Sequence, residues 1–534
     1  MKVIEHASGL PRKTESLCPE CKETVPAEVF ERDGKVWIRK ECKYHGEQEE
    51  LYWGDIRLYN KAAKFAQEGW GIENPITKED RGCPWDCGLC PRHKSHTALG
   101  NIVLTNRCDL TCWYCFFYAK EGQPVYEPSM EELRKMMLAL RNEKPVGCNA
   151  LQLTGGEPTL REDLLEIVAM AREVGFDHVQ LNSDGIRLAH DPELVKNIRI
   201  AGINTIYLSF DGVSPKTNPK NHWEAPMVLD NCRQTKGLYR FAGIGKNHNM
   251  GVVFVPTVIN GYNDHELGPI LDYAVENLDI VRGVNFQPVS LVGRMSRRER
   301  EKQRITIPDA IHKMAEQTGW LEADDFYPVP CVAPITNFVE ALTNKPRYKL
   351  SAHFACGMAT YALKDDKRGM VPITRFVDVD GLMEFFDEQA HSVKDGGSKV
   401  AAGVKLLSKV RGFVDKKQQP SGLNFPKIMF DVLVKNDYHA LAEMQHRSLF
   451  IGMMHFMDPY NYDTERVNRC EIHYAVPDGR IIPFCSFNVI PERYRDKIQE
   501  NFSVPAESWE RKTGRKLKDD KYRRKLDKDG NLVH

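Results

Sequence analysis

Three closely spaced cysteines are the residues of this chain best suited to metal chemistry. Cys108, Cys112 and Cys115 are separated by three and then two residues, and Tyr114 precedes the last of them. Three thiolates on one tight loop can bind three irons of a [4Fe–4S] cluster and leave the fourth iron without a protein ligand. A substrate or cofactor can chelate that open iron. A zinc site would want a fourth ligand nearby and rarely uses this spacing.

A second group of cysteines has the same three-then-two spacing and lies shortly before the first: Cys83, Cys87 and Cys90. No apolar strand precedes this group, so we interpret it as an auxiliary cluster rather than the reactive one. Its fourth iron is predicted to be open or bound by His93, His96 or a distant cysteine. A structural zinc site is the alternative.

Four cysteines of the C-terminal region lie far apart in the sequence, and we interpret them as ligands of a further [4Fe–4S] cluster: Cys331, Cys356, Cys470 and Cys485. The alternative is a set of buried free cysteines. The two remaining cysteines, Cys148 and Cys232, are given no role beyond packing.

The N-terminal region carries a fourth group of metal-ligating residues: Cys18, Cys21, Cys42 and His45. The alternating stretch GKVWIRK between the two halves predicts a β-hairpin. Two knuckles joined by a hairpin form a ribbon that can bind one tetrahedral ion, either Zn²⁺ or a rubredoxin-type iron. A purely structural metal and an electron relay are both open interpretations, since Zn²⁺ cannot change its redox state.

Short apolar strands alternate with amphipathic helices through the middle of the chain. We expect strands at 101–105, 150–154, 179–183, 205–210, 251–257 and 284–288. The first intervening helix should begin at Ser129, with Glu132 as its capping-box partner. This pattern predicts an α/β fold with a partial (β/α)6 barrel whose chemistry lies at the carboxyl ends of the strands.

Composition and length set the remaining limits. The chain has 534 residues, with Lys plus Arg and Asp plus Glu both at 74, so no overall charge favours nucleic acid. We expect four regions: a metal-binding ribbon at 1–55, a linker with the auxiliary triad at 56–100, a barrel at 101–320 and a C-terminal auxiliary-cluster domain at 321–534. The 15 cysteines, mostly clustered, indicate metal ligation in a reducing compartment, and no signal peptide or membrane-spanning run is evident. We therefore expect a cytoplasmic protein.

The triad at Cys108, with its preceding strand and the motif Thr154-Gly-Gly-Glu-Pro158, resembles the radical S-adenosylmethionine (radical SAM) superfamily. The run GCPWDCGLCPRHKSHT leading into LTNRCDLTCWYC resembles one branch of it. That branch contains the archaeal tetraether lipid synthases and proteins earlier proposed to methylate a pterin precursor of methanopterin.

The resemblance implies that SAM binds at the open iron and is cleaved to a 5′-deoxyadenosyl radical. It also implies a one-electron reductant such as a ferredoxin. Glycines at 155 and 156 would let the backbone approach the methionine amino group of SAM, beside Glu157. The full set of candidate cofactor-binding residues is Tyr114, Gly155, Gly156, Glu157, Ser183, Asp184, Ser209, Asp211 and Gln287.

The resemblance leaves two enzyme functions open. The first is carbon–carbon bond formation between phytanyl chains of archaeal diether lipids, giving tetraether lipids, with peripheral contact to the inner membrane surface. The second is methylation of a pterin, which predicts a smaller, polar pocket. The Met- and Phe-rich stretch 448–458, within a predicted helical insertion at 398–457, favours the first. A nonenzymatic iron–sulfur electron carrier is the third alternative, and the basic final 25 residues are expected to be a solvated tail.

Overall fold

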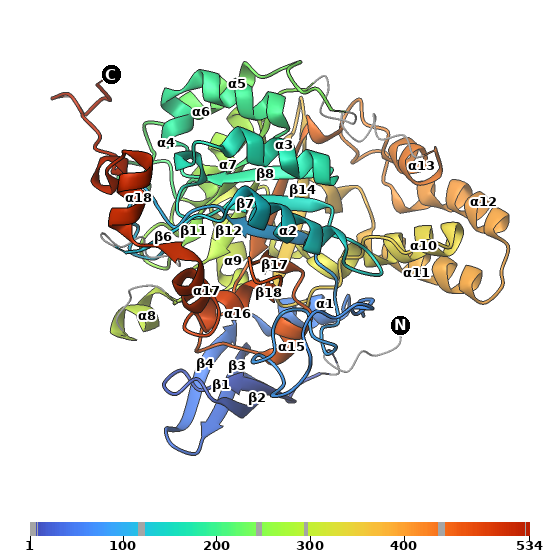
Figure 1. The fold of residues 1–534 in the computed structure, drawn as a ribbon. Helices are drawn as coiled ribbons and strands as arrows, with labels where there is room; N and C mark the ends of the chain where they lie inside the picture. The colour runs from blue at the N-terminus through green and yellow to red at the C-terminus, as the bar shows by residue number, and fades with distance from the viewer. Residues whose placement is uncertain are drawn as a thin grey trace.

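The computed structural model describes residues 7, 9–115, 123–241, 248–292, 297–435, 444–528 and 530–533 (Figure 1). Its N-terminal part is a four-stranded antiparallel sheet in chain order, formed by β1 (Arg12–Leu17), β2 (Thr24–Arg32), β3 (Lys35–Cys42) and β4 (Gly46–Trp53). Burial alternates along β3, as the sequence predicts for a strand with one covered face. The two halves of the predicted metal site are joined by the β2–β3 hairpin.

The ribbon packs on the far end of the chain through buried charges. The Arg12 guanidinium lies 2.7 Å from the Asp463 carboxylate, and both side chains are almost completely buried. Lys40 is also buried and donates to the carbonyl of Pro459 at 3.0 Å. Breaking one partner of such a buried pair leaves an uncompensated charge, so these contacts fix the position of the ribbon.

A 13-stranded sheet forms the centre of the molecule. Six of its strands are parallel neighbours in chain order: β5 (Leu99–Val103), β7 (Ala150–Thr154), β8 (His178–Ser183), β9 (Thr205–Ser209), β10 (Gly251–Val255) and β12 (Val281–Pro288). They overlap the six predicted strands, with bounds that differ by up to three residues, which confirms the α/β class. Closure into a partial barrel stays a prediction.

Strands from the C-terminal region extend this sheet at both sides. Strand β16 (Ser448–Met454) is parallel to β12, and β17 (Ile472–Ala475) is parallel to β5. The other strands of this sheet are β11 (Thr257–Val258), β13 (Tyr327–Pro328), β14 (Gly357–Asp365), β15 (Gly369–Pro372) and β18 (Ile481–Pro483). Strands β6 (Val125–Tyr126) and β19 (Ser503–Val504) pair as a separate two-stranded sheet. The Met- and Phe-rich stretch is therefore mainly a central strand, and its placement in a helical insertion was wrong. Strand β16 is paired on both edges, by β12 and β14, and most of its side chains are buried.

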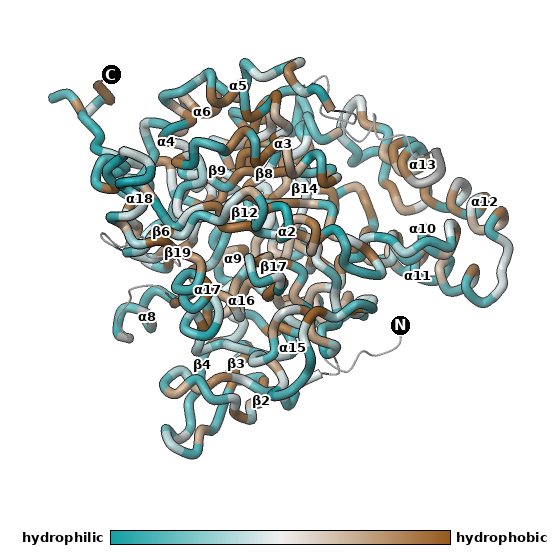
Figure 2. Tube along the Cα trace, viewed as in Figure 1, coloured by the Kyte–Doolittle hydropathy of each residue, from teal (hydrophilic) through white to brown (hydrophobic). Residues whose placement is uncertain are grey.

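Helices pack around the sheet, and apolar residues concentrate between the layers (Figure 2). Helix α2 (Met130–Arg141) begins at Ser129 with the predicted capping box to Glu132. The helices of the βα units are α3 (Leu164–Val174), α4 (Ile186–His190), α5 (Pro192–Ala201), α6 (Ala225–Arg233), α7 (Leu267–Glu276) and α9 (Ile307–Thr318). The others are α1 (Ile56–Ala63), α8 (Arg297–Gln303), α10 (Ala333–Thr343), α11 (Val379–Lys394), α12 (Lys399–Lys409), α13 (Phe425–Lys435), α15 (Thr464–Asn468), α16 (Phe484–Val489), α17 (Arg495–Phe502) and α18 (Ala506–Thr513).

The C-terminal residues are not the solvated tail that their composition predicts. After α18 the chain returns to the middle of the molecule, where Asp520 forms a buried ion pair with Arg107 at 2.8 Å. The Lys521 ammonium donates to the carbonyl of Cys108 at 2.9 Å. Some of the charged residues that led us to expect a solvated tail therefore make tertiary contacts. The composition of the segment could not show which residues they contact.

Candidate metal centres and active site

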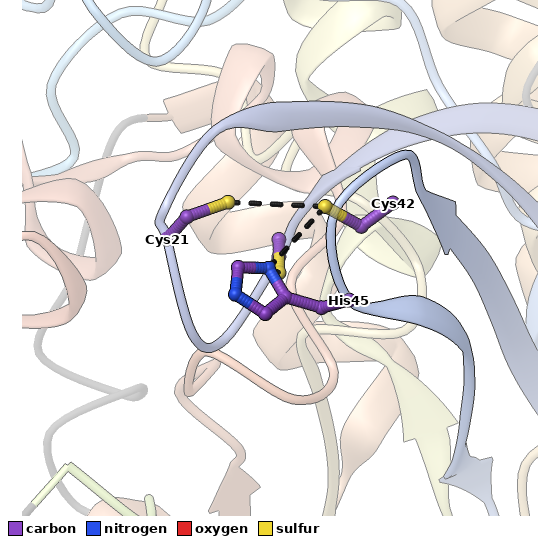
Figure 3. A group of neighbouring side chains, drawn as sticks. Cys21, Cys42 and His45 are labelled. Atoms are coloured by element: carbon purple, nitrogen blue, oxygen red, sulfur yellow. Dashed lines mark hydrogen bonds between the residues drawn. The ribbon is translucent and has the colours of Figure 1, made fainter.

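The four predicted ribbon ligands converge on one point. The ligand atoms of Cys18, Cys21, Cys42 and His45 all lie within 4.8 Å of one another. The Cys21 and Cys42 sulfurs are 3.8 Å apart, and His45 Nδ1 is 3.5 Å from Cys42 Sγ (Figure 3). Zn–S bonds of about 2.3 Å in a tetrahedron place two sulfurs ~3.8 Å apart. Hydrogen bonds from the backbone of Tyr44 and from the His45 ring lower the pKa of Cys42 to about 6, which favours the thiolate that a metal needs.

The cysteines of the Cys108 triad open onto one cavity at the carboxyl ends of the parallel strands. All three line it, together with residues that follow β7, β8, β9 and β12, and its volume is about 420 Å³. Seven predicted cofactor residues also line this cavity: Tyr114, Gly155, Gly156, Ser183, Asp184, Ser209 and Gln287. The two others, Glu157 and Asp211, lie behind its wall and hold lining residues through hydrogen bonds.

The two glycines of the motif also let two loops of the site pack closely together. A Cβ atom on Gly155 would lie 2.4 Å from the carbonyl oxygen of Thr105, and one on Gly156 would lie 2.0 Å from that of Arg107. Both glycines are needed because the loop after β7 packs directly on the loop that leads to Cys108. Gly156 N donates to the Thr105 carbonyl at 2.8 Å, which joins the two loops.

Three carboxyl groups gather beside the first cysteine of the triad. The ligand atoms of Cys108, Asp109 and Asp184 lie within 4.8 Å of one another. Burial and the nearby Glu157 raise the pKa of Asp184 well above its usual range, and burial also raises that of Glu157 to about 7. One carboxyl oxygen of Asp184 has no hydrogen-bond partner within the described residues. This concentration of acceptors suits a cation such as the methionine ammonium of SAM.

A lysine that sequence reasoning missed completes the opposite wall. Lys220 lines the cavity, and its ammonium lies 2.7 Å from the Asp211 carboxylate and 3.1 Å from the Tyr114 hydroxyl. Tyr114 also donates to Asp211, and Lys220 to Ser209. Lys220 lies in the connection after β9, outside any short motif, so only its burial beside a carboxylate marks it as part of the site.

Amide side chains project from four different strands into the same cavity. Gln152 of β7 donates to Asn101 of β5 at 2.7 Å, and Asn285 of β12 donates to the Tyr207 hydroxyl at 2.5 Å. The amides that line the cavity are Asn101, Gln152, Asn182, Asn285 and Gln287. Of these, only Gln287 was predicted, because inward-facing amides within strands carry no local sequence signal.

The second triad is buried beside α16. Cys83, Cys87 and Cys90 all belong to the protein interior, and the Cys87 thiol lies 3.3 Å from the Ser486 hydroxyl. Neither histidine suggested as its fourth ligand is directed to it. His93 contacts the Cys470 carbonyl and the ring of His473, and His96 accepts from the backbone of Lys349.

Three of the four C-terminal cysteines come together. Cys356, Cys470 and Cys485 line one cavity of about 240 Å³, whereas Cys331 lies in the separate apolar core around α10 and α11. The assignment of Cys331 to this group was therefore wrong. Cys331 lies in a short 3-10 turn before α10 and packs with the apolar residues there, which spacing alone could not show. Four apolar residues line both this cavity and the Cys108 cavity: Leu99, Met454, Phe456 and Ile472.

A curated relative is similar in sequence over most of this chain. The chain is 46% identical over 514 residues to a 7,8-dihydro-6-hydroxymethylpterin dimethyltransferase of Methanocaldococcus jannaschii, covering 94% of this chain and 97% of that protein. The chain belongs to the same family as this 7,8-dihydro-6-hydroxymethylpterin dimethyltransferase. The sequence profile of the Radical SAM superfamily matches residues 102–274, and that of the HMPTM N-terminal zinc ribbon domain matches residues 10–54.

More distantly related proteins are similar to only part of this chain. A GTP 3′,8-cyclase of Limosilactobacillus fermentum is 27% identical over 235 residues, which are 43% of this chain and 63% of that protein. A crystal structure of Streptococcus suis SuiB bound to S-adenosylmethionine shows 13% identity and a TM-score of 0.31, covering 42% of this chain and 48% of SuiB.

Membership of this family establishes which cofactors the chain uses. It is a radical SAM protein that uses a [4Fe–4S] cluster and SAM and requires a reductant, and it carries a further metal site in its zinc ribbon. The three thiols, the acidic group at Asp184 and the open cavity fit the cluster and the cofactor. A simple electron carrier would have no use for such a cavity, which counts against that alternative.

The expected tetraether lipid function was wrong. The family member with near-complete coverage is named for a pterin, not for a lipid. The Met- and Phe-rich stretch that favoured the lipid forms a central strand, so it does not provide independent support for an alkyl tunnel. The diether lipid partner and the peripheral membrane contact are withdrawn with that function. Among the described residues, no helix has both the length and the apolar character needed to cross a bilayer.

Proposed function

We propose that this protein methylates a 7,8-dihydropterin of the 6-hydroxymethyl class by radical SAM chemistry. The observation that carries this proposal is the 46% identity to the pterin dimethyltransferase, which extends over 94% of the chain and 97% of that relative. Similarity of that extent includes the ribbon and the C-terminal region as well as the part shared with the whole superfamily.

The cavity has chemistry that supports a pterin. The pyrimidinone edge of a pterin both donates and accepts hydrogen bonds, and amide side chains offer both functions. Five amides line the cavity, whose volume of about 420 Å³ lies in the range of small-molecule sites. Aromatic residues such as Phe456 and Tyr474 line it too and can pack against a flat ring.

The chain's own residues divide between binding and shielding. A reduced [4Fe–4S] cluster bound in this cavity would supply the one electron that reductive cleavage of SAM needs. We assign the ligands of that cluster to Cys108, Cys112 and Cys115, and the acceptors for the methionine ammonium to Asp184 and the carbonyls nearby. Phe450, Phe456 and Phe484 line the same cavity and exclude water from a radical reaction.

Two further clusters are part of this proposal. We assign one to Cys83, Cys87 and Cys90 and another to Cys356, Cys470 and Cys485. In neither set do the three sulfurs all lie within 4.8 Å of one another, as the four ribbon ligand atoms do. Wider spacing agrees with ligands arranged around an iron–sulfur cube, which is larger than a single ion. The cavity of the second set and the substrate cavity share four apolar lining residues.

The test is an anaerobic reaction of the full-length protein with reconstituted clusters, SAM, reductant and 6-hydroxymethyl-7,8-dihydropterin. We expect 5′-deoxyadenosine together with pterin products that are heavier by one and two methyl groups. Methyl-deuterated SAM would show by mass whether SAM donates the methyl carbon. Formation of 5′-deoxyadenosine without any methylated pterin would overturn the proposed substrate.

A further inference from the structure

The end of the chain lies across the loop that carries Cys108. We call residues 514–528 the C-terminal strap. Lys521 Nζ donates to the carbonyls of Cys108 at 2.9 Å and Leu110 at 3.3 Å. Between them, the backbone N–H of Tyr522 donates to the carbonyl of Asp109 at 3.1 Å. Three consecutive carbonyls of the cluster-binding loop are therefore held by two consecutive residues of the strap.

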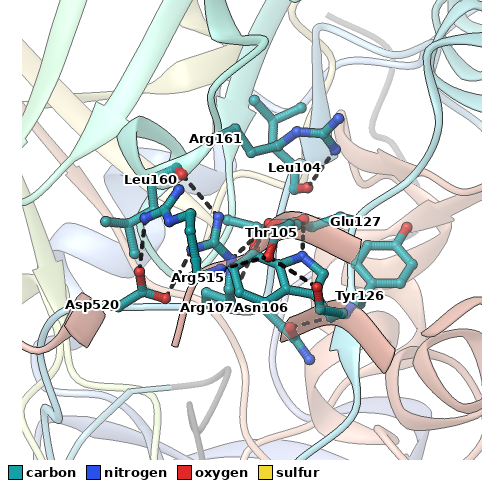
Figure 4. Close-up of polar contacts among 12 residues, drawn as sticks. Leu104, Thr105, Asn106, Arg107, Tyr126, Glu127, Leu160, Arg161, Arg515 and Asp520 are labelled. Atoms are coloured by element: carbon teal, nitrogen blue, oxygen red, sulfur yellow. Dashed lines mark hydrogen bonds and ion pairs between the residues drawn. The ribbon is translucent and has the colours of Figure 1, made fainter. Parts of the chain in front are cut away.

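Buried ion pairs anchor the strap beside this loop. Arg107, immediately before Cys108, binds Asp520 and Glu127 at 2.8 Å each and donates to the carbonyl of Leu160 at 2.8 Å (Figure 4). Arg515 binds the same Asp520 at 3.0 Å. The side chains of Arg107 and Asp520 are only 5% and 4% exposed, so separating them would cost each buried charge one of its two ionic partners.

The other side of the strap reaches the opposite wall of the cavity. Arg524 donates to the carbonyl of Lys220 at 2.6 Å and binds Glu224 at 2.8 Å, and the Tyr522 hydroxyl donates to Glu224 at 2.7 Å. Lys220 itself lines the cavity. The strap thus connects the Cys108 loop with the segment after β9, two parts of the site that no strand pairing joins directly.

The strap also adds a positive charge where negative charges accumulate. Asp109 and Asp184 lie beside Cys108, and a cluster bound there would bring three thiolates. Reduction adds an electron to the cluster, so a nearby cation stabilises the reduced form and a nearby carboxylate destabilises it.

We propose that Lys521 is a positioning residue for the radical SAM cluster, which fixes the Cys108 loop and makes the cluster easier to reduce. The strap is accordingly a structural part of the active site rather than an appendage.

The experiment compares Lys521→Met and Lys521→Arg with Lys518→Met in the full-length protein. Lys518 lies on the same strap with an exposed side chain, so its substitution is the matched control. So that a single centre is observed, each variant is also made with Cys83 and Cys356 replaced by alanine. The readouts are the iron content, the thermal unfolding midpoint and the midpoint potential of the cluster. The potential is measured by a redox titration without SAM, in which electron paramagnetic resonance reports the reduced cluster.

We expect Lys521→Met to make the equilibrium constant for reduction about tenfold smaller, a negative shift of about 59 mV for one electron. Lys521→Arg should keep a potential near that of the parent, and Lys518→Met should not change it. Iron loss confined to Lys521→Met would support the positioning role. Equal potentials and iron contents in Lys521→Met and Lys518→Met would overturn the proposal. None of these readouts requires a pterin, so they are independent of the proposed substrate.

Discussion

Lys220, which lines the cavity of the Cys108 triad, forms a buried ion pair with Asp211 behind the cavity wall, with 2.7 Å between the ammonium and the carboxylate. Tyr114 donates to the same carboxylate. The aromatic residue of the cysteine motif is therefore attached to the end of β9. This contact relates the cluster loop to a strand that lies more than ninety residues further along the chain.

Removing the cation of this pair should destabilise the protein. In Lys220→Met the Asp211 carboxylate stays buried without its partner, and we expect the free energy of unfolding to fall by ~3 kcal/mol. Denaturant unfolding measures the change. The double variant Lys220→Met/Asp211→Asn should recover part of it, and Lys216→Met, an exposed lysine nearby, should change it by less than ~0.5 kcal/mol. A double variant less stable than Lys220→Met would count against an uncompensated charge.

Replacing a triad cysteine should abolish SAM cleavage but not folding. Cys112→Ala removes one of the three thiolates assigned to the reactive cluster, so we expect no 5′-deoxyadenosine above background. Chromatography of the reaction mixture measures the product, and circular dichroism reports the fold. Cys232→Ala, in the buried core of α6, is the control that keeps cleavage. Retained cleavage in Cys112→Ala would remove this cysteine from the cluster.

The amides of the cavity should affect the pterin more than SAM. Asn285→Leu leaves the Tyr207 hydroxyl and the substrate edge without a partner, so we expect kcat/KM for the pterin to fall by about 10- to 100-fold. Cleavage of SAM without pterin should change little. Asn60→Leu, an exposed amide on α1, is the control. Equal losses for both reactions would show that Asn285 supports the whole site rather than the substrate.

Glu143 should make stability depend on pH. It is buried, it accepts from the Thr97 backbone at 2.7 Å, and burial raises its pKa from 4.5 to about 7. Between these values the folded protein binds the proton more tightly than the unfolded chain does, so stability falls as the pH rises through this range. In Glu143→Gln this loss should vanish, and the variant should exceed the parent by up to ~3 kcal/mol at pH 8.

Unfolding measured from pH 5 to pH 8 tests this expectation. The parent and Glu143→Gln should be similar at the acidic end, where Glu143 is protonated, and should diverge toward pH 8. A constant difference over the whole range would mean that the carboxyl does not titrate as burial predicts.

Metal binding by the ribbon should be separable from the iron–sulfur content. Cys42→Ser removes one of four converging ligands, so we expect loss of one metal ion per chain and retention of iron and sulfide. Elemental analysis measures both. Because Arg12 and Asp463 hold the ribbon against the C-terminal region, the thermal midpoint should also fall. Loss of iron and sulfide in proportion to the ribbon metal would contradict independent sites.

Local patterns in the sequence determined several features without any tertiary information. The period of the apolar residues located the six parallel strands, and the spacing of Cys108, Cys112 and Cys115 predicted a loop for an iron–sulfur cluster. The same is true of the ribbon ligands Cys18 to His45. In each case the physical cause is short-range, because a strand, a cap or a tight loop depends on residues that are neighbours in the chain.

Only the tertiary structure decided which distant groups meet. It separated Cys331 from Cys356, Cys470 and Cys485, and it brought Lys220 and the strand amides into the cavity. It also placed Lys521 on the Cys108 loop. Such contacts depend on how the sheet and its connections pack, and a lone lysine or amide has the same local pattern whether it faces solvent or a buried carboxylate.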